Sequence, residues 1–314
     1  MSSPFHPELR RRARLVPRHI IGPRSLRPLR FVQSLADRRR PPSGVELERW
    51  GPVEVRVHRP PRVPGPTRPG VLWIHGGGHV IGSPSQDDRW CREMSERLGA
   101  VVAAVRYRLA PEHPHPAALL DCHQALVELA GQPDVDGNLI AIAGASAGGG
   151  LAAGLAILAA ERGEVTPVLQ VLGYPMLDDR TVLRRSPDPR QLRLWGERSN
   201  EFGWRSHLGR APGSADVAST AAPARHHDLS GLAPAWIGVG TVDLFYDEDL
   251  AYADRLRAAG VACDVFVVEG AFHGFDAVAP RARVTRSFRD AQIDVLADAF
   301  GSESGAPAVA AGRP

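Results

Sequence analysis

Short, nearly continuous apolar runs recur along the chain and constrain its fold more than any other feature. Six such runs lie at residues 71–74, 101–105, 139–143, 168–172, 235–239 and 265–268. Helix-length amphipathic stretches lie between or after them, at residues 87–98, 117–129, 148–160, 248–259 and 283–299. Runs of this kind are typical of strands buried on both faces of a parallel sheet. The alternation therefore predicts an α/β fold, with a mostly parallel sheet flanked by helices.

Three segments fall outside this rhythm. Residues 53–57 alternate in polarity, as a strand exposed on one face does. Between residues 177 and 232 there is Arg, Trp, Pro and Ser but no clean strand pattern. We interpret this stretch as an insertion over the carboxyl edge of the sheet, where α/β proteins place their ligand crevice. The tail from residue 301 has little to bury, and we predict that it is disordered.

The first 40 residues are strongly basic. They hold eleven arginines against two acids, a local balance of +9 in a chain whose net charge is +3. Ser25 is a candidate N-cap for a short helix with its apolar residues on one face, namely Leu26, Leu29, Val32 and Leu35. The segment is an arm for nucleic acid or anionic membranes, a transit peptide, or an amphipathic flap packed on the core. We favour the flap, and expect no nucleic-acid partner and no stable membrane insertion.

The cysteines and the apolar runs indicate the cellular compartment in which the protein is expected. The longest apolar runs are too short for a membrane-spanning helix, which needs about 20 residues, and no secretory signal is visible. Cys91, Cys122 and Cys263 are far apart and lack the paired spacing of zinc or redox motifs. We therefore expect reduced, partly buried thiols and a cytoplasmic protein.

A glycine-flanked serine follows one of the buried runs. Residues 139–150 read LIAIAGASAGGG, which places Gly144-Ala145-Ser146-Ala147-Gly148 between a strand and a small-residue helix. This is the G-x-S-x-G nucleophile elbow in its strand–turn–helix context. Composition alone predicts about 0.2 chance matches, so a glycine-rich turn is the alternative. We predict that Ser146 is a nucleophile and that Gly144 and Gly148 permit the sharp turn.

A second glycine motif, His75-Gly76-Gly77-Gly78, directly follows the apolar run 71–74. Its chance expectation is about 0.01. Successive glycines let backbone N–H groups point into a cavity, and acyl transfer needs such donors because its carbonyl oxygen becomes negatively charged. A flexible loop would explain the glycines but not their position. The N–H of Ala147, after the nucleophile, would supply another donor.

In this fold the acid and the general base follow the nucleophile along the sequence, in the order Ser…Asp…His. His273 follows the run 265–268, and an imidazole can take a serine proton near neutral pH. Asp243 closely follows the run 235–239 and is our predicted acid, which would fix the imidazole tautomer. Asp247 and Asp249 are rivals. Both fall where a helix should start. We therefore expect Asp247 to be the N-cap of that helix and Asp249 to be a charge in its first turn.

The remaining histidines fit this chemistry poorly. His113 and His115 lie among prolines before the nucleophile, and His226 and His227 lie in the insertion. None has metal-ligand spacing with a carboxylate or thiol. We therefore predict no metal and no cofactor.

Together these residues resemble the bacterial hormone-sensitive-lipase family of α/β-hydrolase esterases, over about residues 53–299. The resemblance is carried by six stretches: 75–78, 107–112, the elbow at Ser146, 174–177, 243–248 and 273–275. The sequence departs from the family at Ala145, where Asp or Thr is common, and at Leu244, where Pro is frequent. Within 107–112 we expect Arg108 and Glu112 to pair and hold the loop beneath the site.

The resemblance implies an architecture and an activity. The fold would be the α/β-hydrolase fold, a mostly parallel eight-stranded sheet with a helical cap. The core would be 46–177 and 226–300, the cap 1–45 and 178–225, and 301–314 the tail. The oxyanion hole would be Gly77, Gly78 and Ala147, and homodimers would form through the last strand.

The activity implied is hydrolysis of short- to medium-chain carboxylic esters through an acyl-enzyme, with no cofactor. An amidase or a natural-product deacetylase is an alternative, because the elbow does not distinguish esters from amides. A further alternative is a non-catalytic ligand receptor with the same fold. Trp195, Phe202 and Trp204 either line the substrate pocket or pack the cap.

Overall fold

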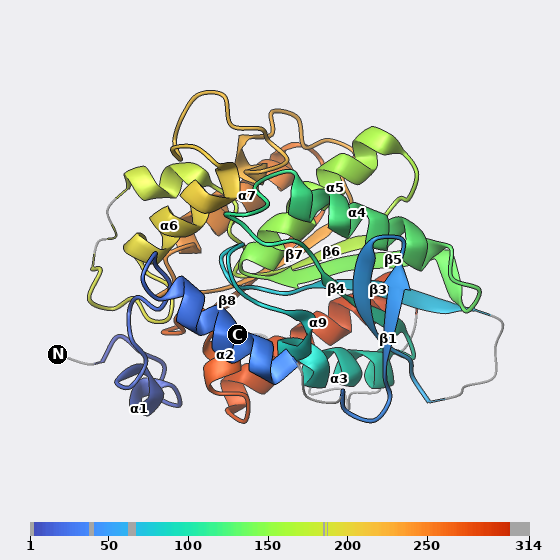
Figure 1. The fold of residues 1–314 in the computed structure, drawn as a ribbon, viewed down its shortest axis with the longest axis horizontal. Coiled ribbons are helices and arrows are strands. Elements are labelled where there is room, and N and C mark those ends of the chain that lie inside the picture. The colour runs from blue at the N-terminus through green and yellow to red at the C-terminus, as the bar shows by residue number, and fades with distance from the viewer. Residues whose placement is uncertain (1–2, 38–40, 62–66, 185, 187, 302–314) are drawn as a thin grey trace, which may run out of the picture.

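The computed structural model describes residues 3–37, 41–61, 67–184, 186 and 188–301. One eight-stranded sheet runs through its centre, in the order β1-β2-β4-β3-β5-β6-β7-β8 (Figure 1). Its strands are β1 (Val45–Trp50), β2 (Val53–His58), β3 (Arg68–Ile74), β4 (Val101–Arg106), β5 (Val135–Ala145), β6 (Leu169–Gly173), β7 (Ala235–Gly240) and β8 (Cys263–Val268). β2 is antiparallel to both of its neighbours, and all other pairs are parallel. The predicted α/β-hydrolase fold, mostly parallel and eight-stranded, is confirmed.

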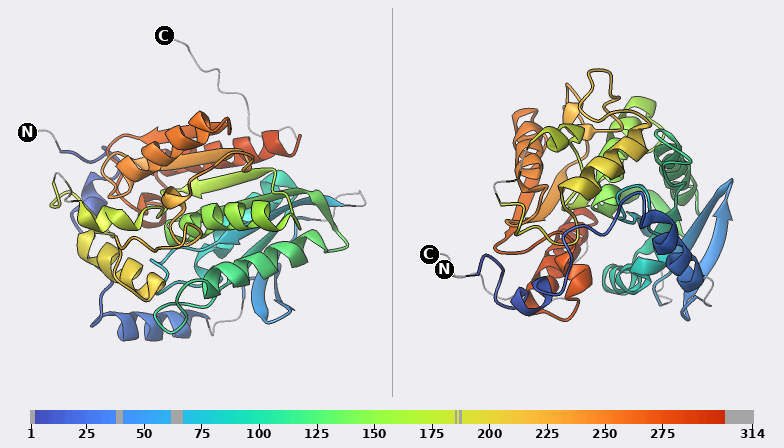
Figure 2. Two further views of the ribbon diagram at one scale, coloured as in Figure 1. Left: turned by 90° about the horizontal axis from the view of Figure 1, so that it is seen from above. Right: turned by 60° about the vertical axis from the view of Figure 1, so that its left-hand side comes forward.

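Helices cover both faces of the sheet (Figure 2). One face packs against α4 (Ala117–Ala130), α5 (Ala147–Arg162) and α7 (Tyr246–Ala258). The other packs against α3 (Asp88–Leu98) and α9 (Arg283–Ala299). Strand β3 illustrates why its run is continuously apolar, since Leu72 and Ile74 enter the first core and Val71 and Trp73 the second.

The segment before β1 forms α1 (Arg10–Ala13) and α2 (Leu26–Asp37) and rests on the molecule, as the flap interpretation predicts. Leu9 and Ala13 are fully buried in the core on the α9 face. The predicted apolar face of α2 is wrong in part. Leu26 is buried and Leu29 packs beside it. Val32 is 64% and Leu35 48% exposed, because Arg30 and Gln33 share the packed face with the two leucines.

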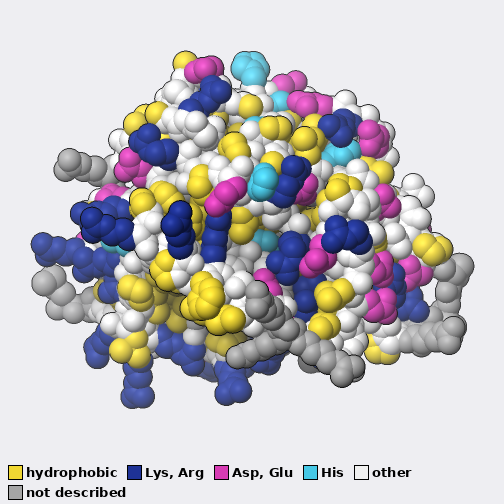
Figure 3. Space-filling view, viewed as in Figure 1, with side chains coloured by type: hydrophobic (Ala, Val, Ile, Leu, Met, Phe, Trp, Pro, Cys, Tyr) yellow, Lys and Arg dark blue, Asp and Glu magenta, His cyan; other side chains and the backbone are white. Residues whose placement is uncertain are grey.

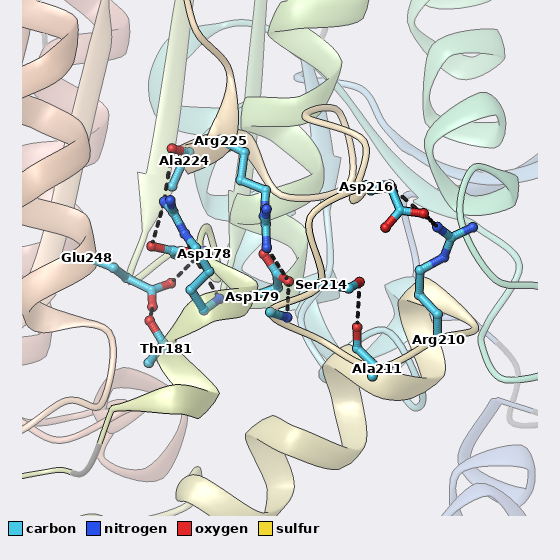
Figure 4. Close-up of polar contacts among 12 residues, drawn as sticks. Asp178, Asp179, Thr181, Arg210, Ala211, Ser214, Asp216, Ala224, Arg225 and Glu248 are labelled. Atoms are coloured by element: carbon cyan, nitrogen blue, oxygen red, sulfur yellow. Dashed lines mark hydrogen bonds and ion pairs between the residues drawn. The ribbon is translucent and has the colours of Figure 1, made fainter.

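Between β6 and β7 the chain leaves the sheet to form η2 (Asp179–Leu183), α6 (Glu197–Leu208) and η3 (Pro223–Arg225). A cluster of polar contacts ties both ends of this insertion together (Figure 4). The Arg225 guanidinium donates to Asp179 at 2.6 and 3.0 Å. Glu248 of α7 accepts the amides of Leu177 and Asp178 and the hydroxyl of Thr181.

Two local expectations are wrong. Arg108 pairs with Asp121 at 2.8 Å and Glu112 pairs with Arg30 at 2.8 Å, so Arg108 and Glu112 are not partners. Asp247 does not cap α7, because Phe245 occupies that position.

The three cysteines are free and buried. No helix in the described part of the chain is long and apolar enough to cross a membrane. The tail predicted to be disordered is 301–314, of which residues 302–314 lie outside the described residues.

Candidate active site

Ser146 occupies the turn between β5, which ends at Ala145, and α5, which begins at Ala147. Its backbone has φ 58° and ψ −123°, a conformation that non-glycine residues rarely adopt. Hydrogen bonds hold the turn on both sides, since the Ser146 amide donates to Gly173 O at 2.8 Å and the Met176 amide donates to Ser146 O at 3.0 Å. Strain maintained in this way is typical of functional positions.

The flanking glycines are needed for space. A Cβ on Gly148 would lie 2.0 Å from the carbonyl oxygen of Ile74, and one on Gly144 would lie 2.5 Å from that of Gly148. No real Cβ approaches backbone oxygen so closely. The elbow can therefore sit directly against the end of β3, which brings Ser146 beside the glycine loop that follows this strand.

Ser146, His273 and Asp243 form a continuous chain of hydrogen bonds. The Ser146 Oγ lies 2.8 Å from His273 Nε2. His273 Nδ1 lies 2.9 Å and 3.1 Å from the two carboxylate oxygens of Asp243. A carboxylate only accepts, so Nδ1 carries the proton and Nε2 accepts from the serine hydroxyl. The structure thus brings together three residues that are far apart in sequence.

All three side chains are shielded from bulk water. Ser146 is 7%, His273 4% and Asp243 7% exposed. Aromatic rings enclose the imidazole, with Tyr174 at 5.0 Å and Phe245 at 5.2 Å between centroids. The Phe245 amide also donates to Asp243 Oδ1 at 3.0 Å, which fixes the carboxylate. Low solvent access strengthens the electrostatic interactions among Ser146, His273 and Asp243.

The rival acids make no contact with His273. Asp247 is exposed on the first turn of α7. Asp249 is fully buried, and neither of its oxygens has a hydrogen-bond partner in the described part of the chain. Asp249 lies in the first turn of α7, as expected. Burial raises the pKa of its carboxyl group well above the ordinary value.

The loop after β3 lies beside Ser146 and holds backbone amides without internal partners among the described residues. Among the described residues, the N–H groups of Gly77, Gly78 and Ala147 form no internal hydrogen bond. Gly77 and Gly78 have φ of 132° and 59°, in the region where glycine is favoured. A Cβ on Gly76 would lie 3.3 Å from Ser146 Cβ, which shows how closely the loop approaches the elbow.

His75, the first residue of this loop, is fixed by contacts with Tyr107 and Gly76. Its ring stacks on Tyr107 at 4.2 Å, and the Tyr107 hydroxyl donates to the His75 carbonyl at 2.8 Å. His75 Nδ1 lies 2.9 Å from Gly76 O. Burial lowers the pKa of His75 to about 4, so the ring is neutral at ordinary pH.

A cavity of about 440 Å³ opens beside Ser146. Its apolar wall comes from the N-terminal segment, the insertion and the core, and includes Ile20, Ile21, Ile81, Leu194 and Trp195. Of the three aromatic residues considered in the insertion, Trp195 lines the cavity. Trp204 is fully buried among packed side chains, and Phe202 packs against the same cluster.

Charged side chains also line the cavity, which the sequence did not predict. Asp87 accepts from Trp73 Nε1 at 2.9 Å, and Asp276 accepts from the Tyr174 hydroxyl at 2.6 Å. Arg289 lies over the Trp90 ring, with its guanidinium carbon 5.1 Å from the ring centroid. Burial raises the pKa of Asp87 to about 7, and the nearby Asp276 adds to this effect.

The other histidines lie outside the hydrogen-bonded chain. His115 contacts a buried pair, His79 and His207, whose rings stack at 3.8 Å. Burial lowers the pKa of His79 to about 3. Within the described residues, no group of three or more His, Cys, Asp or Glu side chains has an arrangement that could hold a metal ion.

Known proteins resemble this chain over most of its length. A family model described as the alpha/beta hydrolase fold matches residues 71–277. Esterase LipI of Mycobacterium tuberculosis is 36% identical over 234 residues, covering 72% of this chain and 71% of the relative. The ethyl acetate hydrolase of Pseudomonas putida is 34% identical over 228 residues, covering 71% of each chain. The solved structure of a bacterial heroin esterase superimposes with a TM-score of 0.84 at 31% identity, covering 95% of this chain and 98% of that one.

Proposed function

The chain belongs to the bacterial hormone-sensitive-lipase family of α/β-hydrolase esterases, and from this premise we propose that it is a serine carboxylesterase with Ser146 as its nucleophile. One observation carries the proposal. The distances from Ser146 Oγ to His273 Nε2 and from His273 Nδ1 to Asp243 are those of hydrogen bonds, 2.8 and 2.9 Å. A serine hydroxyl becomes a useful nucleophile only when a base in this position takes its proton.

The reaction proceeds through an acyl-enzyme in two halves. Ser146 Oγ attacks the ester carbonyl while its proton passes to His273, and Asp243 stabilises the imidazolium that forms. The C–O bond to the alcohol then breaks, and the alcohol leaves with the proton from His273. Water enters, gives a proton to His273 and attacks the acyl carbon. The carboxylic acid departs as that proton returns to Ser146.

The unpaired amides of Gly77, Gly78 and Ala147 are the proposed oxyanion hole. They would donate to the carbonyl oxygen as it becomes an alkoxide, and each such donor contributes roughly 3–4 kcal/mol to the stability of the transition state. Gly144, Gly148, His75 and Gly76 position these groups and take no part in bond breaking.

Residues 1–45 and 178–225 are proposed to act as a cap over the core of 46–177 and 226–300. Support comes from the cavity wall, to which the N-terminal segment gives Ile20 and Ile21 and the insertion gives Leu194 and Trp195. A cavity of about 440 Å³ suits short- to medium-chain acyl esters, and the name of the Pseudomonas relative, an ethyl acetate hydrolase, agrees. A cytoplasmic location and a homodimer formed through β8 stay predictions.

A panel of p-nitrophenyl esters of rising acyl length, with matching p-nitroanilides, tests the proposal. We expect turnover of the esters, highest for short and medium chains, and little cleavage of the anilides. Ser146→Ala should lower kcat by about 10⁴-fold or more while leaving the melting temperature near that of the wild type. Equal turnover by the two proteins would refute the mechanism, and preferential anilide cleavage would indicate an amidase.

A further inference from the structure

Helix α2 packs on the protein through Leu26, Leu29 and the polar residues that share their face. Arg30 donates from Nε to Val80 O at 2.7 Å and from Nη1 to Glu112 at 2.8 Å. Gln33 Oε1 accepts the Gly82 amide at 3.0 Å. Asp37 accepts from Arg106 and from the hydroxyls of Ser83 and Ser85. Positions 30, 33 and 37 share one face of a helix, so these bonds fix which side of α2 faces the protein.

The opposite face of α2 is apolar and exposed to solvent. Phe31 is 63%, Val32 64% and Leu35 48% exposed, and Pro28 is exposed beside them. We call these four residues the α2 patch. A surface helix ordinarily keeps the face that it turns to solvent polar. Leu15, after α1, adds a further exposed apolar side chain at 85%. An apolar solvent face of this kind marks an interaction surface.

Uncompensated arginines accompany the α2 patch. They are exposed and have no ion pair or hydrogen bond among the described residues, and they are Arg11, Arg14, Arg18, Arg24 and Arg27. The acids of the segment are already engaged, Glu8 with Arg283 and Asp37 with Arg106. Figure 3 shows apolar side chains over α2 with basic side chains around them at the lower left of the molecule.

We propose that this surface docks on an anionic lipid membrane, with the α2 patch entering the headgroup region and the arginines meeting lipid phosphates. Apolar side chains rimmed by arginine are the composition of interfacial helices. Each arginine near an anionic membrane strengthens binding about fivefold. Ile20 and Ile21 lie between α1 and α2 and line the Ser146 cavity, so docking brings this cavity close to the bilayer. Esters that partition into membranes are the substrates that gain from this placement.

Other occupants fit the surface less well. A nucleic acid would account for the arginines but would leave Phe31 and Val32 in water. A second copy would cover the α2 patch, but a twofold interface presents the same surface from both subunits. Two sets of unpaired arginines would then enter one interface, and the acids of the segment are already engaged. A membrane satisfies both the apolar and the basic parts of the surface.

The test is flotation of the full chain with vesicles of phosphatidylcholine alone or mixed with phosphatidylglycerol. We expect binding to the mixed vesicles, weakened by salt, and little binding to phosphatidylcholine. Phe31→Ser combined with Val32→Ser should reduce binding at least tenfold, since each buried apolar group contributes to insertion. Arg24→Gln combined with Arg27→Gln should reduce it about 25-fold, fivefold for each arginine. Leu47→Ser, at a residue 53% exposed on β1, is the matched control and should bind normally.

Hydrolysis of p-nitrophenyl acetate in bulk solution separates this proposal from the proposed function, because none of these substitutions touches the active site. It should stay at the wild-type rate in all three variants. Absence of binding to the mixed vesicles, or binding indifferent to the Phe31 and Val32 changes, overturns the proposal. So does a dimer that dissociates when these two residues are changed, because the occupant is then a second copy.

Discussion

Asp179 and Arg225 lie 46 residues apart, and their side chains form an ion pair with bonds of 2.6 and 3.0 Å (Figure 4). Asp179 is fully buried, and it also accepts the Gly213 amide at 2.6 Å. The two residues stand where the insertion leaves the core and where it returns. Their contact therefore closes the base of the segment that supplies Leu194 and Trp195 to the substrate cavity.

Asp179→Asn should destabilise the protein strongly. The Arg225 side chain, only 14% exposed, would lose its counter-charge. We expect the free energy of unfolding, measured by urea denaturation, to fall by roughly 3 kcal/mol. Asp216→Asn is the matched control, because the side chains of Asp216 and its partner Arg210 are 80% and 52% exposed. This change should lower the free energy of unfolding by less than about 1 kcal/mol. Equal effects of the two changes would contradict the importance of the buried pair.

Asp243→Asn should lower kcat by about 10²- to 10⁴-fold with little change in stability. The asparagine oxygen can still accept the Phe245 amide, but its NH₂ group would face His273 Nδ1 and favour the unproductive tautomer. Asp247→Asn, one turn away and exposed, should stay within twofold of the wild type. Kinetics with one p-nitrophenyl ester compare the two, and a larger loss for Asp247→Asn would reassign the acid.

Glu248 should make the protein less stable as the pH rises. Burial raises its pKa from 4.5 to about 8, against the lowering effect of its three hydrogen bonds. Between these values the folded protein retains a proton that the unfolded chain has released. The free energy of unfolding should therefore fall through this window, by up to about 1.4 kcal/mol per pH unit, and level off above pH 8.

Glu248→Gln should flatten this decline in urea titrations between pH 5 and pH 8, whereas Asp247→Asn should leave it unchanged. The raised pKa values of Asp249 and Asp87 contribute in the same direction, so part of the slope should remain in the Glu248→Gln variant. A Glu248→Gln variant with the full wild-type slope would contradict the assignment.

Asp87 should make the hydrolysis of anionic esters pH-dependent. Its pKa is raised to about 7, so it is neutral below that pH and a carboxylate above it. The charged form repels an anionic acyl group in the same cavity. For the p-nitrophenyl monoester of a dicarboxylic acid, kcat/KM should fall roughly tenfold above pH 7, relative to p-nitrophenyl butyrate. Asp87→Asn should abolish that fall; if the fall persists in this variant, another group is responsible.

The core strands could be predicted from sequence because burial on both faces makes them continuous apolar runs. The run 235–239 matches β7 (Ala235–Gly240) almost residue for residue. β1 (Val45–Trp50) could not be recognised in this way. It carries three charges and lies at the sheet edge, where its pairing with β2 decides its conformation.

The site was predictable to the extent that chain order and chemical role restrict the choice. Ser146, Asp243 and His273 each follow a strand that ends at the same edge of the sheet. The charged residues that line the cavity had no such signal, because Asp87, Asp276 and Arg289 come from three helices that meet only in the folded protein. The partners of Arg108 and Glu112 escaped prediction for the same reason, since each pairs with a residue of another segment.

Asp243 and Glu248 lie on either side of the start of α7. Their positions limit how the insertion could be exchanged for that of a related enzyme. Asp243 holds His273, and Glu248 accepts the amides of Leu177 and Asp178, where the insertion begins. A shift of α7 along its axis would displace the imidazole and the foreign segment together. A transplanted insertion can therefore change the acyl range without disturbing proton transfer only if its first residues offer the same donors to Glu248.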